Sequence, residues 1–289
     1  MKKRIAITGH TGFIGSALIK AIRKNKNIEA IGISRSEGID LLNFESMIDL
    51  SNIDKIIHIA GSSGVLKSWC QPYDIYRNNI LSTLNVLEHA RVHRKKPVIY
   101  ISSYIYGIPK YLPVDEKHPI NCSNPYASSK RQAEMLCESY SKDFDIPITI
   151  LRPFNIYGPG QSEESLIARL IKQVKKKNTI EVKDLRPKRD YLYIDDLIDA
   201  IIKVIFGEKN HENLNIYNLG FGQSYSVKNI IDIVAKITNK KLSVHCDMKY
   251  RPNEIMDCFS NSQKFSKRFS WKPNINIVQG IFNLLREEL

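Results

Sequence analysis

Several features that define other classes of protein are missing from this chain of 289 residues. No apolar run approaches the ~20 residues that a membrane-spanning helix needs, so we expect no membrane partner. The basic start, residues 1–4, resembles the first part of a signal peptide, but a glycine turn interrupts the apolar core that should follow. No internal repeat or low-complexity segment is present. These absences predict a globular protein of the cytoplasm.

Paired cysteines are missing as well. The five cysteines are odd in number and scattered, and no two form a CxxC pair: Cys70, Cys122, Cys137, Cys246 and Cys258. We therefore expect reduced thiols, which suit the cytoplasm, and no zinc or other bound metal.

Acidic residues are too few to balance the basic ones, and the formal net charge is +13. Such a surplus is compatible with nucleic-acid binding or, more simply, with solvated lysines that also attract an anionic substrate. The basic runs at residues 94–96, 175–177 and 240–241 fall at expected helix ends and turns, without interleaved aromatic residues. We favour the second interpretation and expect no nucleic-acid partner.

Glycine, by contrast, is concentrated where the chain begins. Residues 3–8 are expected to form a strand, and apolar residues at helical spacing follow over residues 13–24. Between them lies the sequence Gly9-His10-Thr11-Gly12-Phe13-Ile14-Gly15. Glycines at a strand-to-helix turn permit a tight bend and let the backbone approach a pyrophosphate, which faces the free amides of the helix. This pattern predicts a dinucleotide site, although an ordinary glycine-rich turn is the alternative.

Strands and helices then alternate, which predicts an α/β fold with a doubly wound parallel sheet. Further strands are expected at residues 29–33, 55–60, 97–101 and 146–151, and helices at 43–50, 74–93 and 125–142. Ligands bind beyond the carboxyl ends of such strands. A cluster of glycine and proline at residues 152–160 marks a boundary. We expect a dinucleotide-binding Rossmann domain over residues 1–155, with return segments near 188–220, and a smaller α+β substrate lobe over residues 156–289.

The second expected strand lacks the acidic residue that binds the ribose hydroxyls of NAD in many Rossmann folds. Glu29 is at the start of the strand, where it cannot reach the ribose, and Ser34 and Arg35 occupy its end. A hydroxyl and a guanidinium suit a 2′-phosphate, so NADP(H) is favoured and NAD(H) is possible. The alternative is that Arg35 is a solvated loop residue. Asp40 contacts an adenine or caps the helix that follows.

Tyr126 and Lys130 are four residues apart in an expected helix and therefore share one face. A lysine ammonium one turn away favours the phenolate and should lower the tyrosine pKa. Ser102, at the end of a strand 24 residues before Tyr126, can bind the same substrate oxygen. Together these residues suit proton transfer to or from a carbonyl beside a nicotinamide. Two unrelated surface side chains are the alternative for the Tyr126 and Lys130 pair.

Taken together, these patterns resemble the extended short-chain dehydrogenase/reductases, the family of nucleotide-sugar epimerases, dehydratases and reductases. The match runs nearly end to end. Its motifs are residues 8–15, Ser102 with 106–107, Tyr126 with Lys130, and residues 151–160, 189–196, 217–220 and 271–273.

The resemblance implies roles for individual residues and a nucleotide-diphosphate sugar as the substrate. Ser102, Tyr126 and Lys130 resemble the catalytic triad. The expected cofactor-binding residues are Gly9, Thr11, Gly12, Phe13, Ile14, Gly15, Ser34, Arg35, Asp40, Leu41, Ile59, Ala60, Gly61, Asn79, Ile101, Tyr126, Lys130, Pro153 and Ile156. The expected substrate-binding residues are Ser62, Ser102, Ser103, Tyr104, Asn155, Arg189 and Arg251.

Two arginines, Arg189 and Arg251, resemble those that hold the diphosphate, a task that guanidinium groups suit because they bind phosphate bidentately. A loop salt bridge is the alternative for Arg251. Family members commonly dimerise through the helices expected here at residues 74–93 and 126–142, so we expect a homodimer.

Departures from the family pattern narrow the expected reaction. Ser103 and Tyr104 stand where 4,6-dehydratases carry an acidic pair, so elimination lacks its acid and base. Tyr104 is also bulkier than the small hydroxyl residue of many 4-epimerases. These features favour an NADPH-dependent 4-ketoreductase of a nucleotide-linked 4-keto-6-deoxy sugar. The alternatives are a 4-epimerase with tightly bound NAD and a non-catalytic dinucleotide-sensing or RNA-associated protein.

Overall fold

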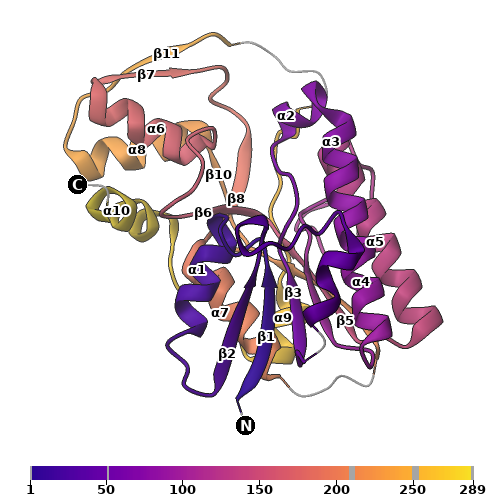
Figure 1. Cartoon of the computed structure of the whole chain (residues 1–289). Coiled ribbons are helices and arrows are strands. Elements are labelled where there is room, and N and C mark those ends of the chain that lie inside the picture. Colours follow the sequence, from indigo (N-terminus) through magenta and orange to yellow (C-terminus); the bar gives the residue numbers. More distant parts are fainter. Residues whose placement is uncertain (1, 51, 208–211, 249–253, 288–289) are drawn as a thin grey trace. The chain divides into compact units, whose positions relative to one another are not determined.

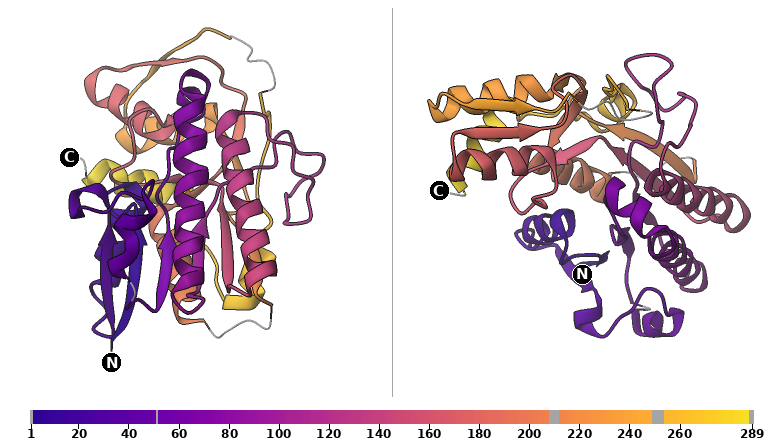
Figure 2. Two further views of the ribbon diagram at one scale, coloured as in Figure 1. Left: turned by 45° about the vertical axis from the view of Figure 1, so that its right-hand side comes forward. Right: turned by 90° about the horizontal axis from the view of Figure 1, so that it is seen from above.

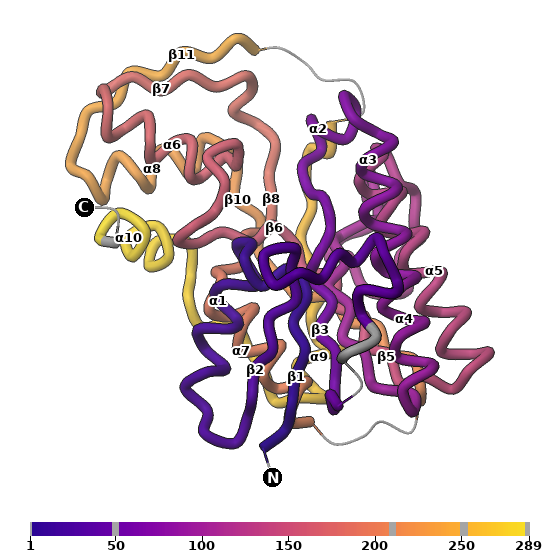
Figure 3. The backbone as a smooth tube through the Cα atoms, viewed as in Figure 1, coloured from indigo at the N-terminus to yellow at the C-terminus, as the bar shows by residue number. Residues whose placement is uncertain are grey.

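The computed structural model of the protein describes residues 2–50, 52–207, 212–248 and 254–287, and Figure 3 traces the chain through them. The chain divides into two compact units. The first contains Met1–Ile105, Ile120–Arg152 and Ala200–Tyr217. The second contains Tyr106–Pro119, Pro153–Asp199 and Asn218–Leu289. Each unit is therefore built from segments that are distant in the sequence.

The first unit is organised around a six-stranded sheet with the strand order β2-β1-β3-β4-β5-β9. All the pairs from β2 through to β5 are parallel. The strands are β1 (Lys3–Thr8), β2 (Ile28–Ile33), β3 (Lys55–His58), β4 (Val98–Ile101), β5 (Ile148–Pro153) and β9 (Leu214–Leu219). The chain places β2 on one side of β1 and then returns to add β3, β4 and β5 on the other side. This reversal makes the sheet doubly wound, as predicted.

Helices cover both faces of this sheet, as Figures 1 and 2 show. The helix α1 (Phe13–Ile22) lies on one face, while α4 (Ser82–Val92) and α5 (Pro125–Phe144) run side by side on the other. Alternate strand residues such as Ala6, Ile56 and Ile150 pack against α4 and α5 in the buried core. Fully burying each isoleucine contributes roughly 1.5–3 kcal/mol.

The single long helix expected at residues 74–93 is interrupted in the structure. After α2 (Val65–Cys70), α3 (Pro72–Tyr76) begins with a proline at its first position, and a π-helical turn η3 (Arg77–Leu81) joins it to α4. Asn78 and Asn79 lie in this turn, and both bond to Ser62. The π turn therefore directs two neighbouring asparagines towards one loop, which helical periodicity could not predict. The expected helix at 43–50 is the 3₁₀ segment η2 (Phe44–Leu50).

The second unit contains two small sheets. In the first, β8 (Lys188–Tyr193) lies between β6 (Asn155–Tyr157), which is parallel to it, and β10 (Ser224–Ser226), which is antiparallel. In the second, β7 (Thr179–Val182) pairs in parallel with β11 (Ser243–Cys246). Its helices are α6 (Leu166–Lys176), α8 (Val227–Thr238), α9 (Gln263–Phe269) and α10 (Ile277–Glu287), and α7 (Ile194–Phe206) contributes residues to both units.

The loop after β4 belongs to the second unit, which the sequence analysis did not expect. Residues 106–119 are held there by hydrogen bonds to Asn218: the Tyr106 hydroxyl donates to its Oδ1 (2.6 Å), and its Nδ2 donates to the Val114 carbonyl (3.0 Å). Glu116 accepts from the Asn218 backbone amide at 2.8 Å. The unit boundary near the Gly/Pro cluster falls after Arg152, three residues before the expected position.

All five cysteines are free thiols. Within the described ranges, no group of three or more His, Cys, Asp or Glu side chains gathers as a metal site would require. No helix in the same ranges has the length and apolar character needed to cross a membrane.

Candidate functional site

The turn between β1 and α1 requires glycine at two positions. Gly9 has φ +69°, and a Cβ there would lie 2.8 Å from backbone atoms of Ala60, at the end of the neighbouring strand β3. A Cβ on Gly15 would lie 2.1 Å from the Gly9 carbonyl oxygen. These backbone segments can approach each other so closely only because Gly9 and Gly15 carry no side chains. This turn, which we call the cradle, is where the sequence predicts that a pyrophosphate binds.

A cavity of about 440 Å³ opens beside this turn, within the first unit. Nine of its lining residues were predicted to bind cofactor or substrate: Gly9, Thr11, Ser34, Arg35, Asp40, Leu41, Ala60, Gly61 and Ser62. Six were not predicted: Ile33, Ser36, Ile39, Leu42, Asn78 and Ser82. Its volume is within the ordinary range for small-ligand sites, and it lies beyond the carboxyl ends of β1, β2 and β3. That these residues hold the adenosine half of a dinucleotide stays a prediction.

The end of β2 carries a carboxylate that the sequence analysis missed. Glu37 accepts hydrogen bonds from the hydroxyls of Ser34 and Ser36, and its other oxygen is 3.3 Å from His10 Nε2. It comes from the 3₁₀ turn η1 (Arg35–Glu37), which ends at Gly38 with φ +79°. Gly38 was the available sequence signal, because a glycine that ends a short turn can bring the preceding side chain back onto the strand end.

Asp40 and Arg35 are paired on the rim of the same cavity. Arg35 Nε lies 3.4 Å from Asp40 Oδ1, and the latter also accepts from the Leu42 amide at 3.1 Å. Asp40 therefore lines the cavity and caps the following turn, so the two roles considered for it are compatible.

Asn79, expected to contact the cofactor, is buried and bonded on both sides. Its Oδ1 accepts from the Ser62 amide (2.7 Å), and its Nδ2 donates to the Ser62 carbonyl (3.1 Å) and to Ser129 Oγ (2.8 Å). The hydrogen bonds of Asn79 thus connect the loop after β3 to helix α5. It supports the cavity wall and is not part of its lining.

The expected catalytic side chains come from the end of β4 and the start of α5. Asn124 caps that helix by accepting from the Ala127 amide at 2.9 Å, and Pro125 occupies its first position. Lys130 is buried, and its Nζ donates to the carbonyl of Ile101, the last residue of β4, at 2.7 Å. This bond fixes α5 against the strand end that bears Ser102.

Ser102 follows Ile101 and is also buried. Its amide donates to the Leu151 carbonyl at 2.8 Å, whereas its Oγ has no partner among the residues that the structure describes. Because a buried hydroxyl without a partner is costly, this group is suited to bind a ligand oxygen.

Burial decides the acid–base character of Tyr126. Desolvation raises the pKa of its phenol, and the nearby Tyr104 raises it further, while a hydrogen bond with the Ser103 side chain has the opposite effect. The predicted fall of this pKa was wrong in direction, because desolvation of the buried phenol is the largest cause that acts on it. Tyr126 is consequently a proton donor at neutral pH.

Lys130 is itself shifted by its surroundings. Burial lowers its pKa to about 8, and the carboxylate of Glu134 and the thiol of Cys137 act in the opposite direction. Its Nζ lies 4.4 Å from the ring centroid of Tyr100. The buried His58, whose pKa falls to about 3, adds no charge beside it at neutral pH.

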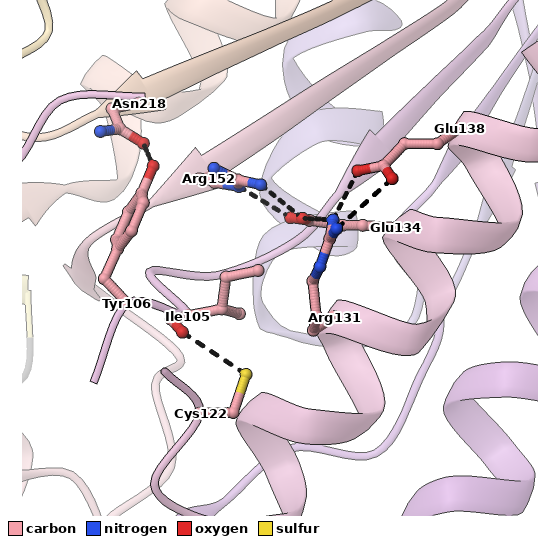
Figure 4. Close-up of polar contacts among 8 residues, drawn as sticks. All are labelled: Ile105, Tyr106, Cys122, Arg131, Glu134, Glu138, Arg152 and Asn218. Atoms are coloured by element: carbon pink, nitrogen blue, oxygen red, sulfur yellow. Dashed lines mark hydrogen bonds and ion pairs between the residues drawn. The ribbon is translucent and has the colours of Figure 1, made fainter. Parts of the chain in front are cut away.

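A buried ion pair anchors α5 to β5 one helical turn beyond Lys130 (Figure 4). Arg152 binds both oxygens of Glu134, from Nε to Oε1 at 2.9 Å and from Nη2 to Oε2 at 2.6 Å. Arg131 lies 3.5 Å from Glu134 Oε2 and also binds Glu138. Glu134 was not predicted, although its spacing of four residues from Lys130 was a signal for it.

The remaining expected substrate residues lie in the second unit. Asn155 Nδ2 donates to the Asp190 carbonyl at 3.0 Å. Arg189 is 2.6 Å from Glu254 Oε1 and also donates to the Ile255 carbonyl. The part that these residues play in substrate binding stays a prediction. Arg251 lies outside the described residues.

The remaining cofactor residues have ordinary structural positions. In the first unit, Gly12, Phe13 and Ile14 lie at the start of α1, and the Ile59 amide donates to Thr8 Oγ1 at 3.1 Å. Pro153 ends β5 and Ile156 lies in β6, both in the second unit, and their contact with a cofactor stays a prediction.

Asp190, beside Arg189, organises the loop after β9. It is fully buried and accepts from the backbone amides of Phe221, Gly222 and Ser260 and from Ser260 Oγ at 2.7 to 3.0 Å. Burial raises the pKa of Asp190, and these donors oppose that shift. The buried acid therefore fixes the strand that carries Arg189.

Known proteins resemble this chain in sequence and in structure. A sequence model of the NAD dependent epimerase/dehydratase family matches residues 5–220. GDP-6-deoxy-D-mannose reductase of Pseudomonas aeruginosa is 29% identical over 300 residues, which cover 99% of this chain and 97% of the relative.

Two solved structures are similar over nearly their whole lengths. RMD from Pseudomonas aeruginosa, complexed with NADPH, has a TM-score of 0.90 at 28% identity and covers 99% of this chain and 98% of its own. A variant of UDP-glucuronic acid 4-epimerase from Bacillus cereus, in complex with UDP-4-deoxy-4-fluoro-glucuronic acid and NAD, has a TM-score of 0.91 at 29% identity and covers 98% of both chains.

Proposed function

This chain belongs to the NAD dependent epimerase/dehydratase family, and from that premise we propose that it is an NADPH-dependent 4-ketoreductase of a nucleotide-linked 4-keto-6-deoxy sugar. It is an enzyme of the extended short-chain dehydrogenase type. The observation that carries the proposal is the arrangement of Ser102, Tyr126 and Lys130 around the end of β4.

The chemistry follows from what these side chains do to one carbonyl oxygen. When bound, the nicotinamide cofactor supplies the hydride. The Ser102 hydroxyl donates a hydrogen bond to the sugar carbonyl oxygen and so orients it. Tyr126, kept protonated by its raised pKa, gives its proton to that oxygen. The Lys130 ammonium stabilises the phenolate that remains.

Two further features favour reduction over the other reactions of the family. Ser103 and Tyr104 replace the acidic pair that dehydration requires, and a raised Tyr126 pKa suits proton donation. The similar reductase from Pseudomonas aeruginosa and the similar NADPH complex support the same reaction.

A panel of nucleotide sugars with NADPH tests the proposal. We expect loss of NADPH absorbance with a 4-keto-6-deoxy sugar linked to a nucleoside diphosphate, and a stoichiometric alcohol product. Purified protein that carries bound NAD and interconverts two sugars without net cofactor turnover would contradict the reductase and establish an epimerase.

The 4-epimerase with NAD is the second candidate, and Glu37 is the observation that favours it. Its carboxylate lies at the end of β2, where an acid can accept hydrogen bonds from ribose hydroxyls. The similar epimerase from Bacillus cereus was solved with NAD.

The rate of the reductase should fall at alkaline pH. Lys130 has a pKa of about 8, so its ammonium is lost above that pH and with it the charge that stabilises the phenolate. We expect kcat to be level below about pH 7 and to approach a tenfold fall per unit above about pH 8. Stopped-flow measurement of NADPH oxidation at saturating substrate checks this. A flat profile up to about pH 10, in protein that remains folded by circular dichroism, would contradict it.

A homodimer through the helices α3–α4 and α5 stays a proposal. Met135 and Phe144 on α5 are exposed apolar side chains, as expected of a helix that packs against a second copy. Light scattering after size-exclusion chromatography would measure the mass directly.

A further inference from the structure

We propose that Tyr100 is a positioning residue of the candidate catalytic centre, and that its aromatic face stabilises the ammonium group of Lys130. The contact between the two side chains lies wholly within the first unit. The proposal rests on the proposed function only where turnover is measured, because the charge on Lys130 can be measured in the protein without cofactor or sugar.

The side chain of Tyr100 reaches Lys130 because of its position in the sheet. Tyr100 is the third residue of β4, and alternate residues of a strand face the same side. Tyr100 and Val98 both pack in the buried core that includes residues of α4 and α5. Lys130 comes from α5, and its Nζ lies 4.4 Å from the centroid of the Tyr100 ring. This distance is within the ~6 Å over which an aromatic face attracts a cation.

Two consecutive residues of β4 therefore contact the ammonium group. Its Nζ donates to the carbonyl of Ile101 at 2.7 Å, and the ring of Tyr100 lies beside it. A carbonyl oxygen and an aromatic face both carry partial negative charge, so both favour the ammonium over the neutral amine. Because Lys130 is almost completely buried, these contacts replace the water that would otherwise solvate its charge.

The ring of Tyr100 is itself held in place by the neighbouring strand. His58 is the register partner of Tyr100 in the parallel pairing of β3 with β4, and the two rings are stacked with their centroids 5.6 Å apart. Hydrogen bonds fix the His58 ring on both sides, with Thr8 Oγ1 at 2.8 Å and with Thr83 Oγ1 at 3.1 Å. The sheet thus sets the orientation of the aromatic face that Lys130 meets.

The acidic groups near Lys130 on α5 compensate its burial only in part. Burial lowers the pKa of Lys130 to about 8, and Glu134 and Cys137 act in the opposite direction. Both carboxylate oxygens of Glu134 are bound to Arg152, so the guanidinium charge offsets part of the attraction that Glu134 exerts on the ammonium. Burial also raises the pKa of the Cys137 thiol, which is therefore neutral at neutral pH.

The aromatic and imidazole groups around Lys130 are uncharged at neutral pH. The pKa of His58 falls to about 3, and burial raises the pKa values of Tyr126 and Tyr100. Tyr100 consequently acts on the ammonium through its aromatic face and not through a phenolate charge.

The pKa of Lys130 in the cofactor-free protein tests the proposal directly. It is measured by NMR titration of protein that contains isotope-labelled lysine, and the Lys130 signal is identified by its absence from Lys130→Arg. We expect Tyr100→Leu, which removes the aromatic face, to lower this pKa to about 7. Tyr100→Phe keeps the aromatic face and should leave the pKa at about 8.

Lys55 is an internal control in the same titration. Burial lowers its pKa to about 8 as well, and its Nζ donates to the carbonyls of Val204 and Ile205 at the end of α7. Lys55 begins β3, three residues before the register partner of Tyr100, and we expect its pKa to stay the same in every Tyr100 variant.

A third substitution separates the charge of the aromatic face from its packing. Pentafluorophenylalanine in place of Tyr100 keeps an aromatic ring, but fluorine withdraws electron density from the face of that ring. We expect the pKa of Lys130 to fall as in Tyr100→Leu, in protein that remains folded by circular dichroism. This measurement decides the proposal if Tyr100→Leu does not fold.

The outcomes separate the role of Tyr100 from the proposed function. A Lys130 pKa that is unchanged or raised in the fluorinated protein overturns the role of Tyr100, even if the protein reduces a keto sugar. A fall that is equally large in Tyr100→Phe also overturns it. A fall confined to the variants without an electron-rich face supports the contact, and the alkaline fall in kcat should then move to lower pH with it. If no keto sugar is reduced, the proposed function fails while the measured contact stands.

Discussion

Replacing Tyr126 with phenylalanine is expected to lower kcat by about 10²–10⁴-fold, the usual range for loss of a general acid. The change removes the proton that the raised pKa keeps on this side chain at neutral pH, and it preserves the ring that fills the same space. The affinity for NADPH should change little, because Tyr126 does not line the cavity that we propose for the adenosine half. Single-turnover kinetics and a cofactor titration measure the two effects separately.

Tyr140 offers a matched control for this experiment. It lies on the same helix, and its hydroxyl donates to Glu88 Oε2 at 3.2 Å, so Tyr140→Phe also deletes one phenolic oxygen and one hydrogen bond. We expect the Tyr140 variant to keep wild-type turnover. Equal losses in both variants, or full activity in Tyr126→Phe, would mean that the proton comes from another group.

The second large effect is expected on stability, from Glu134→Gln. Arg152 and Glu134 are both almost completely buried, and the substitution leaves the guanidinium charge without its counter-charge. Breaking such a pair costs about 3–5 kcal/mol of unfolding free energy. Urea unfolding, followed by circular dichroism, measures the loss.

Two further variants test whether the loss of unfolding free energy in Glu134→Gln depends on the burial of the ion pair. Glu138→Gln removes a partly exposed carboxylate that binds Arg131, and about 1 kcal/mol or less should be lost. The double variant Glu134→Leu with Arg152→Met removes both buried charges and should recover most of the stability. A small loss of unfolding free energy in Glu134→Gln, similar to that in Glu138→Gln, would contradict an ion pair that is shielded from water.

The same substitution has a kinetic consequence. The Glu134 carboxylate opposes the depression of the Lys130 pKa, so its removal should move the alkaline fall in kcat to lower pH. A destabilised but otherwise normal enzyme would keep the wild-type pH profile. The shift therefore distinguishes electrostatic tuning of Lys130 from a purely structural role.

Local spacing predicted the tight turn that requires Gly9 and Gly15. The resemblance named nine of the residues that line the cavity at the ends of β1, β2 and β3, and their contact with a cofactor stays a prediction. Local spacing also predicted the shared origin of Tyr126 and Lys130 on α5. The doubly wound sheet and the family resemblance are confirmed as well.

The differences from the predictions concern local turns that periodicity does not show and the effect of burial. A π turn directs Asn79 to Ser62 and Ser129, and its contact with a cofactor stays a prediction. Glu37 was overlooked because the turn that ends at Gly38, and brings Glu37 back to Ser34 and Ser36, was not recognised in the sequence. The Tyr126 pKa was predicted to fall, because the sequence shows a nearby lysine but not the desolvation that outweighs it.

The sequence by itself determined the alternating strands and helices of the doubly wound sheet, the glycine turn after β1, and the helix face that carries the phenol and the ammonium, because each depends on a periodicity or on residues a few positions apart. The tertiary structure alone decided which charges are buried, which carboxylate meets the end of β2, and which unit takes the loop at 106–119. The physical reason is that solvation and long-range pairing depend on how separate segments pack together, which no local pattern encodes.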